Sequence, residues 1–225
     1  MVVVIDDDNI SQHGALLEKI YRFRHALFVE RLNWEACRRP DGREIDQFDG
    51  PGCIHLAYLE GGEITAYTRL LPTTRPHLLT EVYPHLAQRG PAPRGATVYE
   101  WTRCGTLPAR REGRTGLIDP ATAGIFTAAA EVARARGLDG LLAQTHPILV
   151  NRLMSCGWDV EPLGLPTRYN GHAILAVYAR LMPDTVTSSR AFFGLQASPL
   201  HETSLHAPRA PAVRLPVPAE RRLHA

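Results

Sequence analysis

The sequence predicts an α/β protein, a three-layer αβα sandwich built around one mixed sheet. Segments with apolar residues at helical spacing alternate with β-branched and aromatic runs, and glycine or proline residues separate them. With 225 residues, 44% of them hydrophobic, the chain is long enough for one globular domain. We expect this domain to span residues 1–183. A tail rich in Pro, Ala, Arg and His follows over 184–225; it lacks apolar periodicity and is expected to be mostly disordered.

One helix and one hairpin are expected in the first third of the chain. Apolar residues recur at helical spacing over residues 11–31, at Leu16, Leu17, Ile20, Phe23 and Leu27. On a neighbouring face of this helix, Tyr21, Arg24 and Phe28 lie one turn apart. The charged segment 38–52 contains prolines and glycines, which predicts a loop. Two β-rich runs, 53–60 and 63–71, flank Gly61-Gly62 and predict a hairpin.

The rest of the domain is expected to alternate strands and helices. Asp119 and Pro120 supply an N-cap and a first-turn proline for a helix that ends at Gly137. Around that helix we expect strands over 97–107, 138–145 and 173–181, and a further helix over 147–156.

Composition argues against several classes of function. The net charge of +2 is too small to indicate nucleic-acid binding. Cys37, Cys53, Cys104 and Cys156 form no Cys-x-x-Cys pair and no zinc-like spacing with histidine, so no metal site is expected. No apolar run approaches the roughly 20 residues that span a bilayer, and the first residues lack the basic region of a signal peptide. We therefore expect a cytoplasmic protein.

A charged pair lies inside the expected strand over 97–107. Glu100 and Arg103 are surrounded by Val, Tyr and Trp, and an unpaired charge is costly to bury. Strict alternation would place the two on opposite faces, so they share one cleft only if a β-bulge intervenes. Such a bulge would also splay the sheet and free backbone N–H groups as an oxyanion site. The alternative is a structural ion pair of Glu100 with Arg103 or Arg69.

The segment Arg110-Arg111-Glu112-Gly113-Arg114-Thr115-Gly116 stands just before the helix expected from 119. A basic loop in front of a helix N-terminus can bind an anion, and a solvated arginine loop is the equally weighted alternative. The pattern is close to the pyrophosphate loop of N-acetyltransferases, although the second glycine is missing.

A set of residues spread over 15–160 resembles the acyl-homoserine lactone synthases, the autoinducer synthases of bacterial quorum sensing. The set comprises Tyr21 to Glu30 with Trp34, then Asp46, Asp49 and Arg69, then Glu100-Trp101-Thr102-Arg103. Thr102 stands where the family usually has serine. Residues 38–44 look closest to members that use acyl-coenzyme A. The resemblance implies an N-acetyltransferase-like fold, S-adenosylmethionine as the amine-donating substrate, and an acyl thioester as the second substrate.

The resemblance also implies roles for individual residues. Glu100 would be the base that removes a proton from the amine. The predicted S-adenosylmethionine site consists of Arg24, Phe28, Trp34, Asp46, Asp49, Arg69 and Arg103. The predicted acyl and thioester site consists of Thr102, Arg103, Arg110, Arg111, Leu142, Gln144, Thr145 and His146. The acyl donor would be acyl-coenzyme A or an acyl carrier protein, and no cofactor is expected because S-adenosylmethionine is a substrate.

Each role has a structural alternative. Phe28 and Trp34 are candidates for ordinary core packing; Asp46 and Asp49 either hold the substrate ammonium or sulfonium, brace Arg24 and Arg69, or belong to a solvated loop. His146 is as well explained as a structural histidine. Two other functions compete with the synthase: an N-acyltransferase that acts on another amine, and a non-catalytic ligand-binding relative.

Overall fold

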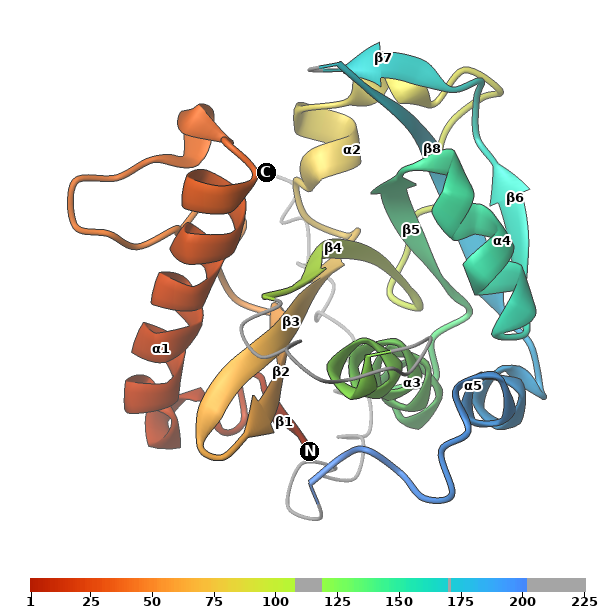
Figure 1. Cartoon of the computed structure of the whole chain (residues 1–225). Coiled ribbons are helices and arrows are strands. Elements are labelled where there is room, and N and C mark those ends of the chain that lie inside the picture. The colour runs from red at the N-terminus through yellow and green to blue at the C-terminus, as the bar shows by residue number, and fades with distance from the viewer. Residues whose placement is uncertain (108–118, 170, 202–225) are drawn as a thin grey trace, which may run out of the picture.

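The computed structural model describes residues 1–107, 119–169 and 171–201. Its centre is a mixed sheet in the order β1-β2-β3-β4-β5-β8-β6, with β7 paired to β8 off this path (Figure 1). Among the strands of the described residues, β4 and β5 are the one parallel pair, and the other neighbouring strands are antiparallel. The strands are β1 (Val2–Ile5), β2 (Ile54–Glu60), β3 (Glu63–Pro72), β4 (Val98–Thr106), β5 (Gly140–Thr145), β6 (Trp158–Pro162), β7 (Thr167–Tyr169) and β8 (His172–Leu181).

Helices cover both faces of the sheet, which confirms the predicted three-layer αβα class. The helix α1 (Gly14–Arg24) packs on one face, and the short helix α2 (Leu78–Glu81) lies on the same side over β5 and β8. The opposite face carries α3 (Pro120–Ala135), α4 (Pro147–Ser155) and α5 (Thr185–Phe193). Because β4 and β5 are parallel, a crossover must join them, and α3 provides it. Within the described residues, no helix is long and apolar enough to cross a membrane.

The predicted helix over 11–31 is correct in position but changes type. The α-helical part ends at Arg24, and residues His25–Arg31 continue as a π-helix, in which the Leu32 N–H donates to the Leu27 carbonyl. A π-turn holds an extra residue, and such turns are frequent at functional sites. Here the consecutive residues Leu27, Phe28 and Val29 are all buried.

A β-bulge in β4 confirms the predicted irregularity. Arg69 pairs with Thr102 and Tyr67 pairs with Gly105, so the two residues Arg103 and Cys104 oppose the single Thr68. Arg103 has a left-handed backbone with φ of 53°, which is uncommon for a residue with a side chain. The extra residue turns the Arg103 side chain to the face that Glu100 and Thr102 share.

The sheet opens where β4 and β5 stop pairing. Their parallel ladder runs from Val98–Gly140 to Trp101–Ala143, although both strands continue beyond it. Beyond that point the two strands separate in Figure 1. The predicted splay is therefore present, directly after Glu100 and Trp101.

The structure corrects the predicted boundary at residue 183. Residues 184–201 are ordered: α5 packs on α3, and residues 199–201 run beside β1. Val2 donates a backbone hydrogen bond to Pro199 (2.7 Å) and accepts one from His201 (2.8 Å). The sequence pattern missed this because α5 buries small polar groups rather than an apolar stripe. The Ser189 hydroxyl, for example, bonds to that of Thr127 at 3.0 Å. Residues 202–225 of the predicted tail lie outside the described residues.

Truncation tests this correction. A chain that ends at Pro183 loses Val186 and the ion pair between Arg190 and Glu131 (2.6 Å), and it exposes the apolar surface of α3. We expect a cost of about 3 kcal/mol or more and a melting temperature lower by at least ~6 °C. The reference is a chain that ends at His201, because it keeps every described contact of this segment. Equal melting temperatures for the two chains would show that the segment does not stabilise the domain.

Candidate active site

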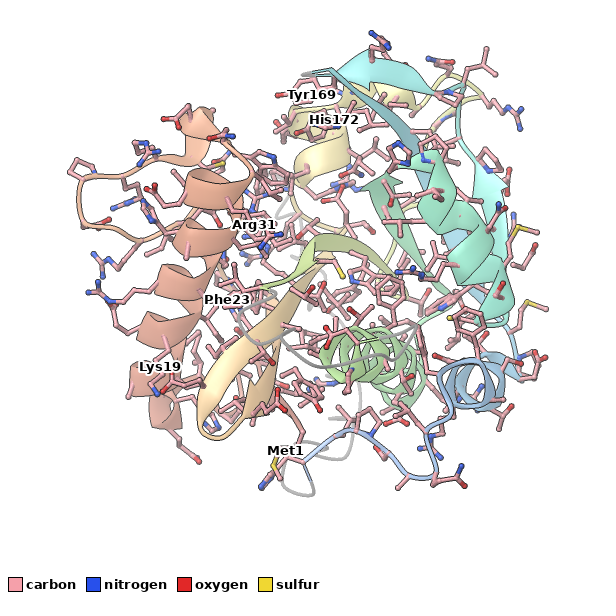
Figure 2. All side chains as sticks on the ribbon, viewed as in Figure 1. Met1, Lys19, Phe23, Arg31, Tyr169 and His172 are labelled. Carbon is pink, nitrogen blue, oxygen red and sulfur yellow. The ribbon has the colours of Figure 1, made fainter. Side chains whose placement is uncertain are left out.

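A cluster of alternating charges lies on the sheet face beside α1. Its cations come from the end of α1, from β3 and from the β4 bulge, and its carboxylates all come from the loop between the π-helix and β2. Its members are Arg24, Arg69, Arg103, Glu44, Asp46 and Asp49. Figure 2 shows side chains filling the space between α1 and α2.

Asp49 holds two of the arginines together. Its carboxylate accepts two bonds from Arg24 (2.7 and 2.9 Å) and one from Arg69 (2.7 Å). Burial alone would raise the pKa of the Asp49 carboxyl, but Arg24 and Arg69 outweigh burial and keep the pKa well below its usual range. Both guanidinium groups are fully buried. The structure thus confirms the bracing alternative for Asp49.

Glu44 is a member of the cluster that the sequence analysis missed as a site residue. Its side chain is 1% exposed and bridges Arg24 (Nε, 2.6 Å) and Arg103 (Nε, 3.2 Å; Nη2, 3.0 Å). Burial opposes ionisation, yet the two arginines lower the pKa of its carboxyl. The available signal was its place in the charged loop over 38–52, but a solvated loop would have the same pattern.

Asp46 forms the more accessible edge of the cluster. Its side chain is 13% exposed and bonds to Arg69 (2.7 and 2.9 Å) and to Arg103 (2.9 Å). A tight turn fixes it: the Asp46 N–H donates to Asp49 Oδ2 (2.9 Å), and its own Oδ1 accepts from the Phe48 N–H (3.0 Å). Hydrogen bonds therefore hold this part of the loop, and Phe48 anchors it further in an apolar cluster with Leu71 and Leu78.

An aromatic pair continues the cluster toward solvent. The rings of Phe28 and Trp34 are stacked with centroids 4.9 Å apart, and the Arg103 guanidinium lies 5.7 Å from the first ring and 5.3 Å from the second. Phe28 is buried, whereas Trp34 is 37% exposed. The core-packing alternative therefore fits Phe28 alone. Trp34 presents an aromatic surface to solvent beside Arg103.

Glu100 lies apart from the arginines. Its fully buried carboxylate accepts hydrogen bonds from the Leu78 N–H (2.8 Å), the Leu79 N–H (2.7 Å) and the Gln144 amide (2.9 Å). Within the described residues it forms no ion pair with Arg103 or Arg69, so that structural alternative is wrong. Glu100 instead caps the start of α2 at the point where β4 and β5 separate.

The residues predicted for the acyl and thioester site have different surroundings. Leu142 is buried beneath α2, and Gln144 bonds to Glu100. Thr145, the last residue of β5, is partly buried. Thr102 accepts a bond from Arg69 (3.1 Å). His146 caps α4, accepting a bond from the Ile148 N–H (3.2 Å), which is the structural alternative. Arg110 and Arg111 lie outside the described residues.

Asp49, Cys53 and His55 are the one group in the described part of the chain with metal-ligand geometry, their donor atoms lying within 4.8 Å of one another. The charge balance argues against a cation there, because Asp49 already binds two arginines. His55 instead bonds to the Tyr67 hydroxyl (2.6 Å) and contacts the Cys53 sulfur (3.5 Å).

Comparison with known proteins identifies the family of this chain. A sequence model described as autoinducer synthase matches residues 7–190. The chain belongs to the autoinducer synthase family. It is 35% identical over 166 residues to an isovaleryl-homoserine lactone synthase of Bradyrhizobium diazoefficiens, covering 74% of this chain and 73% of that protein. It is 31% identical over 174 residues to an acyl-homoserine-lactone synthase of Acinetobacter nosocomialis, covering 75% and 93%.

Solved autoinducer synthases share the fold. BjaI, described as a CoA-dependent acyl-homoserine lactone synthase, superposes with a TM-score of 0.82 at 30% identity over 93% of this chain and 95% of its own. MesI, described in the same terms, gives 0.80 at 27% identity over 90% and 100%. The predicted family, fold and enzyme class are thus confirmed: this autoinducer synthase is an acyltransferase that makes an acyl-homoserine lactone from S-adenosylmethionine and an acyl donor.

The buried His55 gives this autoinducer synthase a defined pH dependence of stability. Burial lowers the pKa of His55 to about 4, and Arg24 and Arg69 also lower it, partly offset by Asp49. The unfolded chain takes up a proton below about pH 6.5 and the folded one does not. Stability present above pH 6.5 is therefore lost as the pH falls toward 4, by roughly 3 kcal/mol in total.

His55→Gln removes this titration. Its free energy of unfolding, measured by denaturant titration between pH 7 and 4, should fall less steeply than that of the wild type. The exposed His172 provides the control, since His172→Gln should keep the wild-type slope. Equal slopes in the wild type and His55→Gln would contradict the assignment.

Proposed function

We propose that this autoinducer synthase takes its acyl group from a coenzyme A thioester and that the acyl group is short. The Bradyrhizobium diazoefficiens relative at 35% identity is an isovaleryl-homoserine lactone synthase, and BjaI has been solved with SAM and isopentyl-CoA. Both names indicate a short branched acyl group. They support the same donor class for this chain.

The packing around the β4–β5 opening supports a short acyl chain. The Gln144 amide reaches across the opening to Glu100. Below it, Leu79, Leu142 and Ala176 are buried in one apolar cluster with Tyr178, so side chains already fill this side of the sheet. A long chain would have to displace these groups, whereas a short one needs little rearrangement.

The proposed S-adenosylmethionine site rests on one observation. The partly exposed ring of Trp34 stacks on Phe28, beside Arg103 and Asp46. Aromatic faces suit both an adenine ring and a sulfonium. Asp46, the most exposed carboxylate of the cluster, is placed to meet the positive charge of this substrate. Arg24 and Arg69 are fully buried and paired, so in this proposal they position Asp46, Asp49 and Glu44 and need not touch the substrate.

The proposed reaction has two steps. After a base removes a proton, the substrate amine attacks the thioester carbonyl; an amide forms and coenzyme A leaves as the thiol. The methionyl carboxylate then displaces the sulfonium, which closes the lactone and releases methylthioadenosine. No electrons are gained or lost in either step, so the proposal needs no further cofactor. Backbone N–H groups freed at the β4 bulge and the opening are candidates to stabilise the oxyanion.

A donor panel tests the proposal. The protein is incubated with S-adenosylmethionine and with isovaleryl, butanoyl, octanoyl or dodecanoyl thioesters, each on coenzyme A and on acyl carrier protein. Release of methylthioadenosine and the mass of the lactone are measured. We expect kcat/KM for short coenzyme A thioesters to exceed that for long ones by at least about tenfold, as repacking of filled space would cost ~1–3 kcal/mol. A preference for acyl carrier protein or for dodecanoyl donors would contradict the proposal.

Replacing Trp34 tests the S-adenosylmethionine site. Trp34→Ala should weaken S-adenosylmethionine binding by roughly tenfold or more, since a desolvated cation–π contact contributes up to ~2 kcal/mol. Calorimetry measures the affinity, and a melting curve checks the fold. Phe192→Ala is a matched control, because Phe192 is 39% exposed and lies 4.9 Å from the ring of Phe193 on α5. Unchanged affinity in Trp34→Ala would remove this residue from the site.

A further inference from the structure

A second ionisable group adjoins Glu100. His77 lies just before α2, its side chain is 2% exposed, and its Nδ1 is 3.1 Å from Glu100 Oε1. The two atoms are within ion-pair distance but are not aligned for a hydrogen bond. In the described part of the chain, Nδ1 of His77 is one of three buried side-chain nitrogen or oxygen atoms without a hydrogen-bond partner.

An unsatisfied buried nitrogen needs an explanation. Leaving such a group without a partner is destabilising, and most buried polar groups are paired. The Thr80 hydroxyl accepts from the His77 N–H (3.3 Å), so the backbone N–H of His77 is satisfied at the start of α2.

Neutral donors hold Glu100 in place. Its carboxylate accepts bonds from the Leu78 N–H, the Leu79 N–H and the Gln144 amide. Free carboxyl, imidazole and α-amino groups titrate near about 4.3, 6.5 and 7.8 respectively, so an imidazole matches an amine as proton acceptor much better than a carboxylate does.

We propose that His77 accepts, through Glu100, the proton that leaves the amine of S-adenosylmethionine. The ammonium gives a proton to a Glu100 oxygen, and Oε1 passes it to Nδ1 of His77, so the carboxylate is restored and the imidazole becomes imidazolium. The neutral amine then attacks the thioester carbonyl. As the C–S bond breaks, the second proton of the nitrogen goes to the leaving thiolate, and His77 later returns its proton to solvent.

The charges around His77 fit this role. Across the described residues, Glu100 on β4 is the one ion-pair partner of His77, and Gln144, which reaches Glu100 from β5, is neutral. The three arginines of the neighbouring cluster are already paired with carboxylates. Before transfer the buried pair carries one negative charge, held by three N–H donors. After transfer it is a neutral carboxylate–imidazolium pair, which is the less costly charge state to bury. His77 is thus a positioning residue that acts through Glu100.

The test is the pH profile of single-turnover acylation in the wild type, His77→Asn and Glu100→Gln. Asparagine places a nitrogen near the position of Nδ1 but takes up no proton, so the fold and S-adenosylmethionine affinity should be kept. We expect His77→Asn to slow acylation about 10²-fold at neutral pH, within the range for acid–base groups. The pH profile of the wild-type rate should contain a titration step that is absent from His77→Asn.

The exposed His172, on the β7–β8 hairpin in Figure 2, supplies the control. His172→Asn should keep both the rate and the pH profile. The inference rests on the proposed acylation step, so the assay uses whichever thioester the wild type turns over fastest. If the proposed acyl donor is wrong, the donor panel shows it, and the comparison of the wild type with His77→Asn is unaffected. His77→Asn with a normal rate, or with a wild-type pH profile at lower thermal stability, would overturn the inference.

Discussion

The extra residue in β4 is the constraint on which the site depends. In a regular strand Arg103 would share the α3 face with Trp101, inside the largest apolar cluster. An unpaired guanidinium there would cost several kcal/mol. The bulge, with Arg103 at a φ of 53°, turns this side chain toward Glu44 and Asp46 instead. The strained backbone is retained because the alternative buries an unpaired charge.

Charge balance then fixes the loop that carries the carboxylates. Arg24, Arg69 and Arg103 meet three carboxylates in bonds of 2.6 to 3.2 Å, so each ion is compensated by more than one partner. Removing one member of such a buried network leaves others unpaired, at about 3–5 kcal/mol. These bonds connect a loop rich in charge, proline and glycine to α1, β3 and β4. Its outer edge, at Asp46 and Trp34, remains open to solvent.

The sequence predicted features that follow from local periodicity or from the cost of burying charge. The hairpin, α3 with its Asp119 cap, and the β4 bulge belong to this group. Three features could not be predicted from the local sequence pattern. The π-turn changes which residues share a face, Glu44 looks like any carboxylate of a solvated loop, and α5 buries Ser189 against an alanine-rich helix. Glu44 and Ser189 depend on partners distant in the chain, and the π-turn departs from the regular period on which the helix prediction rests.

Glu100 has a structural role at the start of α2 in addition to its proposed chemical role, and the family resemblance does not indicate that structural role. Because its carboxylate holds the first two N–H groups of α2, it has little freedom to move and is preorganised at the β4–β5 opening. The adjacent His77 differs, because its Nδ1 is buried without a hydrogen-bond partner among the described residues, 3.1 Å from Glu100 Oε1. In the proposed relay, Glu100 sets the geometry and His77 receives the proton.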